Sequence, residues 1–216
     1  MITNLSDQNS VFSEWIRELR DIDLQNDRMR FRRNIERIGE IAAYEISKIL
    51  PYKIITIQTP MGEAICHELE EQPVLATILR AGLPLHQGLL NYFDKADNAF
   101  IAGYRKHHID GSFEAEQQYL TCPDITNRPL ILADPMLASG SSLVLALQSL
   151  LDSGKPSQLH IVCVIACTEG IELLTRKFPN AHIWAGAIDD ELTAKGYIVP
   201  GLGDAGDLSF GTKKQS

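Results

Sequence analysis

The sequence of 216 residues is short of the features that mark secreted, membrane and nucleic-acid-binding proteins. It has four cysteines, no apolar run of membrane-spanning length, and no basic and then apolar segment in residues 1–9. Acidic residues outnumber basic ones, and the net charge of −8 disfavours binding to nucleic acid or to acidic membranes. We therefore expect a cytoplasmic protein with reduced thiols, no nucleic-acid partner and no membrane partner.

Hydrophobic residues make up 44% of the chain and charged residues 22%, which is typical of a globular domain with a buried core. The expected strands are residues 53–58, 74–79, 98–104, 129–133, 158–166 and 181–188. The expected helices are a short one around Trp15 and Leu19, followed by 29–50, 61–71, 85–92, 143–151 and 168–177. This alternation predicts an α/β fold with a mainly parallel twisted sheet flanked by helices.

We expect a single domain over residues 1–216, with a helical extension at 1–27 and a C-terminal segment, 190–216, that covers a ligand site. Residues 106–128 are polar and have no clear period, which predicts a flexible loop or an extended β-arm. Arginines at 28, 30, 32, 33 and 37 predict a helix face that is solvated or that pairs with another subunit.

The stretch from Pro129 to Ser142 reads P-L-I-L-A-D-P-M-L-A-S-G-S-S, which is a strand, an acid, a loop of small residues and the start of a helix. Free N–H groups and partial positive charge at a helix N-terminus favour anions, and Gly140 allows close approach of the backbone. The stretch predicts a phosphate cradle with Asp134 at its edge. An ordinary N-cap serine after a buried strand is an equally good interpretation of these residue types.

A second candidate segment, Arg80-Ala81-Gly82, follows strand 74–79 at its carboxyl end, where open parallel sheets bind ligands. A guanidinium and nearby backbone N–H groups can hold an anion together. A surface arginine next to a turn glycine is the alternative. Arg105 follows strand 98–104 in the same way.

The C-terminal segment 197–213 contains a literal G-x-G-x-x-G at glycines 201, 203 and 206. We do not expect a dinucleotide site, because that motif has to open a helix within a βαβ unit. The segment instead predicts a glycine-rich hood whose backbone N–H and C=O groups meet a small planar ligand, with Tyr197 able to stack on it. A terminal loop that packs on the core is the alternative.

Together these segments resemble the uracil phosphoribosyltransferases of the type I phosphoribosyltransferase superfamily. The matching stretches are L-R-A-G-L (79–83), Y-R (104–105), D-P-M-L-A-S-G-S-S (134–142), and Y-I-V-P-G-L-G-D-A-G-D with F-G-T-K (197–213). The resemblance implies a glycosyltransferase of pyrimidine salvage that joins uracil to 5-phosphoribosyl 1-diphosphate (PRPP), giving UMP and diphosphate. It also implies Mg²⁺ as cofactor, bound mainly through the diphosphate of PRPP, with Asp204 as a possible further ligand.

The resemblance also implies residue roles, and a non-proline cis peptide in the turn at 80–82. The implied catalytic residues are Arg80, Arg105, Asp134 and Asp204. The implied PRPP-binding residues are Arg80, Ala81, Gly82, Arg105, Asp134, Pro135, Met136, Leu137, Ala138, Ser139, Gly140, Ser141, Ser142 and Asp204. The implied uracil-binding residues are Tyr197, Ile198, Gly203, Asp204 and Ala205.

The sequence departs from the family pattern at Ser141 and Pro84, where glycine is usual, and in residues 106–120, which lack the usual acidic run. We expect a homodimer or higher homo-oligomer, with GTP as a candidate allosteric effector. Two other functions fit the motifs less well: a catalytically weak PRPP- or UMP-sensing regulator, and a phosphoribosyltransferase for another base. The acidic composition disfavours an RNA-binding regulator, and the hood motif favours uracil.

Overall fold

A twisted sheet of eight strands forms the centre of the computed structural model, which describes residues 1–107 and 113–213. Of residues 103–107 and 113–118 it describes the backbone alone. The strands are β1 (Ile2–Asn4), β4 (Val74–Leu79), β5 (Asp97–His107), β6 (Phe113–Thr121), β7 (Pro129–Ala133), β8 (Met136–Leu137), β9 (Gln158–Cys167) and β10 (His182–Asp189). They lie in the order β1-β10-β9-β7-β4-β5-β6, with β8 beside β9, and every pair is parallel except β5–β6. The predicted fold class is confirmed.

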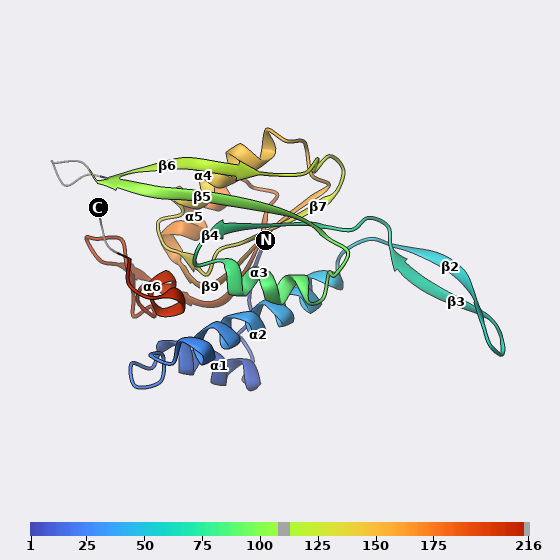
Figure 1. Ribbon diagram of the computed structural model, residues 1–216, viewed down its shortest axis with the longest axis horizontal. Helices are drawn as coiled ribbons and strands as arrows, with labels where there is room; N and C mark the ends of the chain where they lie inside the picture. Colours follow the sequence, from blue (N-terminus) through green and yellow to red (C-terminus); the bar gives the residue numbers. More distant parts are fainter. Residues whose placement is uncertain (108–112, 214–216) are drawn as a thin grey trace.

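Helices cover both faces of this sheet (Figure 1). One core joins the sheet to α1 (Val11–Arg20), α2 (Arg28–Ser47) and α3 (Leu83–Leu90), and a second core joins it to α4 (Ser141–Leu151) and α5 (Thr168–Lys177). Successive residues of a strand point to opposite faces, so a strand buried on both faces is apolar throughout. Strand β7 shows this, because all five of its residues are buried and Leu130 to Ala133 alternate between the two cores.

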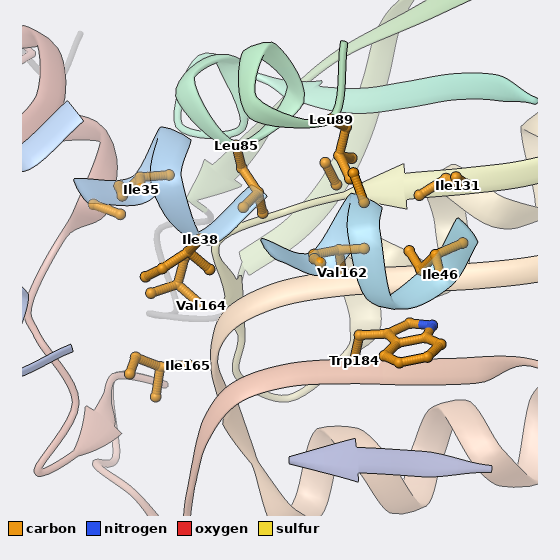
Figure 2. Packing of buried hydrophobic residues seen from close by; sticks show 14 of the residues in the cluster. Ile35, Ile38, Ile46, Leu85, Leu89, Ile131, Val162, Val164, Ile165 and Trp184 are labelled. Atoms are coloured by element: carbon orange, nitrogen blue, oxygen red, sulfur yellow. The ribbon is translucent and has the colours of Figure 1, made fainter. Parts of the chain in front are cut away.

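Helix α2 is the central element of the first core (Figure 2). Its Ile38 and Ile46 are fully buried between α3 and the sheet, where Trp184 of β10 packs. Helices α2 and α3 are in close contact because Gly39 of α2 faces Gly88 of α3. A Cβ at Gly88 would overlap the carbonyl oxygen of Glu36, so a side chain there would push the helices apart.

The predicted helix over 61–71 is wrong, because residues Gly62–Leu69 form strand β3, paired antiparallel with β2 (Tyr52–Thr59). The predicted strand 53–58 is therefore a strand, but it belongs to a hairpin that projects from the body and not to the central sheet (Figure 1). Pro60 and Met61 form its two-residue turn, and Gly62 takes a positive φ of 145°. The Pro60–Met61 turn followed by Gly62, directly after the strand 53–58, is the signal that the helical interpretation missed.

The described residues of the segment 106–128 include the end of β5 and all of β6, which pair antiparallel at the edge of the sheet. Residues Lys106 and His107 end β5, residues 113–121 form β6, and residues 122–128 lead to β7. Residues 108–112 lie outside the described part. Strand β1, which the sequence did not predict, adds an edge to the sheet beside β10.

The C-terminal segment contains β11 (Glu191–Leu192), β12 (Ile198–Val199) and α6 (Ala205–Phe210). Strands β11 and β12 pair antiparallel, and α6 lies beside the N-terminal half of α2 (Figure 1). Within the described residues, no helix is both long enough and apolar enough to span a membrane.

Candidate active site

Two of the predicted anion-binding segments begin at the same edge of the sheet. Strands β4 and β7 are parallel neighbours, and Thr77 pairs in register with Ala133. The hydroxyl of Thr77 donates to the carbonyl oxygen of Ala133 at 3.1 Å. The arginine-glycine turn after β4 and the loop that begins at Asp134 after β7 therefore lie side by side, as ligand sites do at the carboxyl ends of parallel strands.

The turn after β4 has the backbone that the resemblance implied, because the Leu79–Arg80 peptide bond is cis. Gly82 closes the turn by donating its N–H to the carbonyl oxygen of Ile78 at 3.1 Å. A Cβ at Gly82 would overlap the Thr77 hydroxyl and would lie 2.9 Å from the carbonyl oxygen of Ala133. Only glycine fits here, because the turn packs directly on the end of β7.

The predicted phosphate cradle is a loop that leads into α4. Asp134, half-buried, donates its N–H to the carbonyl oxygen of Val162 at 3.0 Å, and its carboxylate accepts from the N–H of Met136 at 3.4 Å. Pro135 is buried, Met136 and Leu137 form β8, and Ala138 packs on the core. Asp134 therefore marks the start of a loop that is anchored on β9.

Gly140 is the N-cap residue of α4, with a φ of 82° and no side-chain cap. The alternative interpretation, an N-cap serine, is therefore wrong for this helix. Ser139 and Ser141 place their hydroxyl oxygens 3.3 Å apart, and Ser141 is exposed within the first turn. Its Cβ therefore does not crowd the loop, although the family usually has glycine there. The first N–H groups of α4 and these hydroxyls are donors of the kind that can bind an anion.

The third predicted segment, the hood, contacts the arginine-glycine turn directly. The Arg80 guanidinium donates from Nη2 to Oδ1 of Asp207 at 2.5 Å and from Nη1 to the carbonyl oxygen of Gly211 at 2.9 Å. A Cβ at Gly206 would lie 3.7 Å from Cβ of Ala81 and from Nε of Arg80. Arg80, the residue predicted to bind the diphosphate, is thus bonded to the segment predicted to bind the base. The bond is made through Asp207, a residue that the sequence analysis did not select.

The predicted uracil-binding residues differ in exposure. Tyr197 is 49% exposed and Gly203 is exposed, whereas Ile198 and Ala205 are 5% and 2% exposed as whole residues. Ile198 and Ala205 thus pack into the core, and the exposed part of the predicted base site is at Tyr197 and Gly203. Asp204 is the N-cap of α6: its carboxylate accepts from the N–H of Asp207 at 2.9 Å and lies 3.5 Å from Nζ of Lys213.

Part of the arginine-rich face of α2 holds the hood and is not simply solvated. Arg32 donates from Nη1 to the carbonyl oxygen of Ser209 at 2.6 Å, and Arg28 lies against Gly211. An open cavity of about 790 Å³ lies between this end of α2 and the hood, with Gly203 and Asp204 in its wall. The cavity reaches the hood from the side of α2, and no cradle residue lines it.

The structure does not test the predicted roles of Arg105 and of a bound metal ion. Arg105 is in β5, paired in register with Ala115 of β6, but its side chain is outside the described part. In the described residues, no three or more His, Cys, Asp or Glu side chains gather as a metal site. The candidate site has single carboxylates at Asp134 and Asp204, the kind of group that binds Mg²⁺ together with substrate phosphates.

Comparison with known proteins identifies the combination of turn, cradle and hood. The family model for uracil phosphoribosyltransferase matches residues 6–212. The chain belongs to the uracil phosphoribosyltransferase family. A family member from Porphyromonas gingivalis is 48% identical over 213 residues, covering 98% of this chain and 99% of its own length. One from Pyrococcus furiosus is 38% identical over 201 residues, covering 92% of this chain and 85% of its own length.

Solved structures agree with the family assignment. The AQ2163 protein from Aquifex aeolicus superposes with a TM-score of 0.88 at 29% identity, covering 98% of both chains. An adenine phosphoribosyltransferase from Trypanosoma brucei superposes with a TM-score of 0.52 at 10% identity, covering 76% of this chain and 68% of its own. The second likeness shows a shared fold.

Proposed function

We propose that this member of the uracil phosphoribosyltransferase family transfers the 5-phosphoribosyl group of PRPP to N1 of uracil, giving UMP and diphosphate for pyrimidine salvage. The observation that carries the proposal is the contact between Arg80 and the hood. It joins the base site at 198–205 to a turn that shares its sheet edge with the cradle at 134–142. A sugar phosphate and a flat base can then lie in one site, which gives the positioning that the transfer needs.

The protein's task in this reaction is to stabilise the diphosphate as it leaves C1 of the ribosyl group. The guanidinium of Arg80, the amides of the turn at 80–82 and Arg105 supply positive charge and donors for it. Asp134 accepts hydrogen bonds from the ribose hydroxyls, and the N–H groups and hydroxyls of residues 138–142 hold the 5′-phosphate. Arg80 has to exchange its bond to Asp207 for one to the diphosphate, or share the two, when PRPP binds.

Recognition of uracil in this proposal uses the backbone. The N–H and C=O groups at Ile198 and at 203–205 pair with the polar edge of the base, while Tyr197 stacks on its face. Cytosine presents a donor where uracil presents an acceptor, so its binding would leave buried groups unpaired.

The residues present fit a magnesium ion that arrives with PRPP. Mg²⁺ is usually held by one or two carboxylates together with substrate phosphates. Asp204 is the residue we assign as a direct ligand or as a partner of its bound water, and Lys213 would have to give up its contact to allow this. The ion supplies neutralisation of charge on the diphosphate when it is bound.

An absorbance assay with PRPP and four bases, namely uracil, orotate, hypoxanthine and xanthine, tests the proposal. We expect turnover with uracil alone. Turnover with a different base would show a transferase of other specificity. Binding of PRPP or UMP without turnover of any base would show a sensing regulator.

We also propose a cytoplasmic homodimer or higher homo-oligomer in which GTP acts as an allosteric effector. The projecting β2–β3 hairpin supports the oligomer, because Ile54 is 71%, Met61 96% and Ile65 74% exposed. Light scattering of wild type and Ile65→Lys tests the oligomer, with a smaller mass expected for the variant. Titration of GTP into the assay tests the effector, with a higher rate expected.

A further inference from the structure

A buried ion pair between α1 and the end of β10 lies directly under the hood. Arg20, the last residue of α1, donates from Nη1 and Nη2 to the two carboxylate oxygens of Asp189, both at 2.8 Å. The Arg20 side chain is 23% exposed and that of Asp189 is 7% exposed. Burial would raise the pKa of Asp189, but the hydrogen bonds from Arg20 and from a backbone N–H hold it below its usual value. The carboxylate is therefore charged and rigidly paired.

This ion pair fixes both backbone groups of one hood residue, Gly201. Asp189 accepts from the N–H of Gly201 at 2.9 Å, and Arg20 donates to its carbonyl oxygen at 3.0 Å. Gly201 has a φ of 58°, and a Cβ there would overlap the carbonyl oxygen of Ile198. The chain thus folds back on itself at Gly201, between Ile198 and Gly203, whose backbone groups are the proposed contacts to uracil.

Both halves of the pair are anchored in the protein body. Arg20 follows the fully buried Leu19, and Asp189 is paired in register with Cys167 of β9. A bidentate guanidinium–carboxylate pair has a fixed planar geometry, which an ammonium group cannot reproduce. The position of the loop at 198–203 is therefore set by α1 and β10 together.

We propose that Arg20, through Asp189, is a positioning residue for the uracil site: it holds the peptide groups of Gly201 so that the backbone on either side meets the base. The inference rests on the proposed function. It gives the N-terminal extension a role in base binding, although neither residue touches a substrate. A misplacement of about 1 Å in such a site can cost on the order of a hundredfold in rate.

Kinetics of Arg20→Lys test this proposal, with Arg17→Lys as the matched control. Arg17 lies one turn earlier on α1, is 53% exposed and pairs with Glu14 and Asp21. Its replacement by lysine therefore makes the same chemical change at a position away from the hood. For Arg20→Lys we expect the KM for uracil to rise about tenfold while the KM for PRPP stays within about twofold, because a lysine keeps the charge but loses the bidentate geometry. A merely structural role would lower the active fraction, and so kcat, without moving the KM for uracil.

An unchanged KM for uracil in folded Arg20→Lys, or an equal rise in both KM values, would overturn the proposal. If Arg20→Lys does not fold, Asp189→Asn decides, because it keeps the shape and one acceptor; the same selective rise is expected. A wild type that turns over no uracil would instead contradict the proposed function.

Discussion

The cradle and the hood are both ligand-facing loops, but they are built in opposite ways. The cradle is one continuous stretch, residues 134–142, whose anchors are mostly backbone bonds: Asp134 donates its N–H to Val162 of β9, and Pro135 accepts from Val164. The hood is held by side chains from far away in the sequence: Arg20 bonds to Gly201 across 181 residues, Arg32 to Ser209 across 177, and Arg80 to Gly211 across 131. Backbone bonds to the adjacent strand hold the first segment, whereas side chains from distant parts of the chain hold the second.

The largest effect that separates the two regions is expected for Arg80→Ala. Loss of the guanidinium should lower kcat/KM for PRPP about a thousandfold, because a charge-assisted contact to the departing diphosphate disappears. Binding of uracil should weaken far less, because Arg20 and Arg32 still hold the hood. Steady-state kinetics with each substrate varied in turn measure both, with Arg33→Ala, whose guanidinium pairs with Glu36 on the exposed side of α2, as control. Equal losses for the two substrates would contradict the assignment of the turn.

Lowering the pH should destabilise the protein through a histidine, His160, that lies in neither the cradle nor the hood. His160 in β9 is 2% exposed, and burial followed by the nearby His182 lowers its pKa to about 4. Between pH 6.5 and 4 the unfolded chain binds a proton at His160 that the folded chain does not, so stability falls as the pH falls. The loss amounts to about 3 kcal/mol across this window.

Denaturant unfolding at several pH values measures this slope, which should be smaller in His160→Gln. The ratio of the KM values for uracil and PRPP should not change with this loss of stability, since His160 is in β9 and belongs to neither the hood nor the cradle. An unchanged slope in the variant would contradict the assignment to His160.

The carboxylate at the entrance to α6 is next in expected size. Asp204→Ala should lower turnover with uracil about a hundredfold, because both the helix cap and the charge near PRPP are lost. Asparagine is an equally good N-cap, so Asp204→Asn retains the helix and removes only the charge. If Asp204→Asn is as active as wild type, the residue is a cap for the hood and not a partner of PRPP or its metal.

The smallest effect is expected in the cradle, for Gly140→Ala. Its φ of 82° disfavours any side chain, and a Cβ would lie 3.2 Å from the carbonyl oxygen of Gly170. We expect a stability loss of about 1 kcal/mol and a rise of about tenfold in the KM for PRPP, with uracil little affected. Gly62→Ala, in the projecting hairpin with open space around it, is the control and should change stability alone.

The same contrast explains what the sequence could predict. Strands such as β4 and β7 and helix α5 were predicted to the residue, because continuous apolar runs and turn signals are local. The first strand of the hairpin was predicted, but its second strand, 62–69, was misread as a helix, because its apolar residues Ala64, Ile65 and Cys66 are consecutive and do not alternate with polar ones. The bonds that Arg20 and Arg32 donate and that Asp207 accepts had no sequence signal at all, since a charged side chain does not indicate which distant group it will meet. The family resemblance located the hood, but not what holds it.

A crystal structure with bound UMP is the most direct test of the central claim, that hood and cradle form one site. We expect the uracil ring against the backbone of Ile198 and of residues 203–205, and the phosphate against residues 139–142. A base remote from the hood, or a phosphate bound away from the N-terminus of α4, would contradict it.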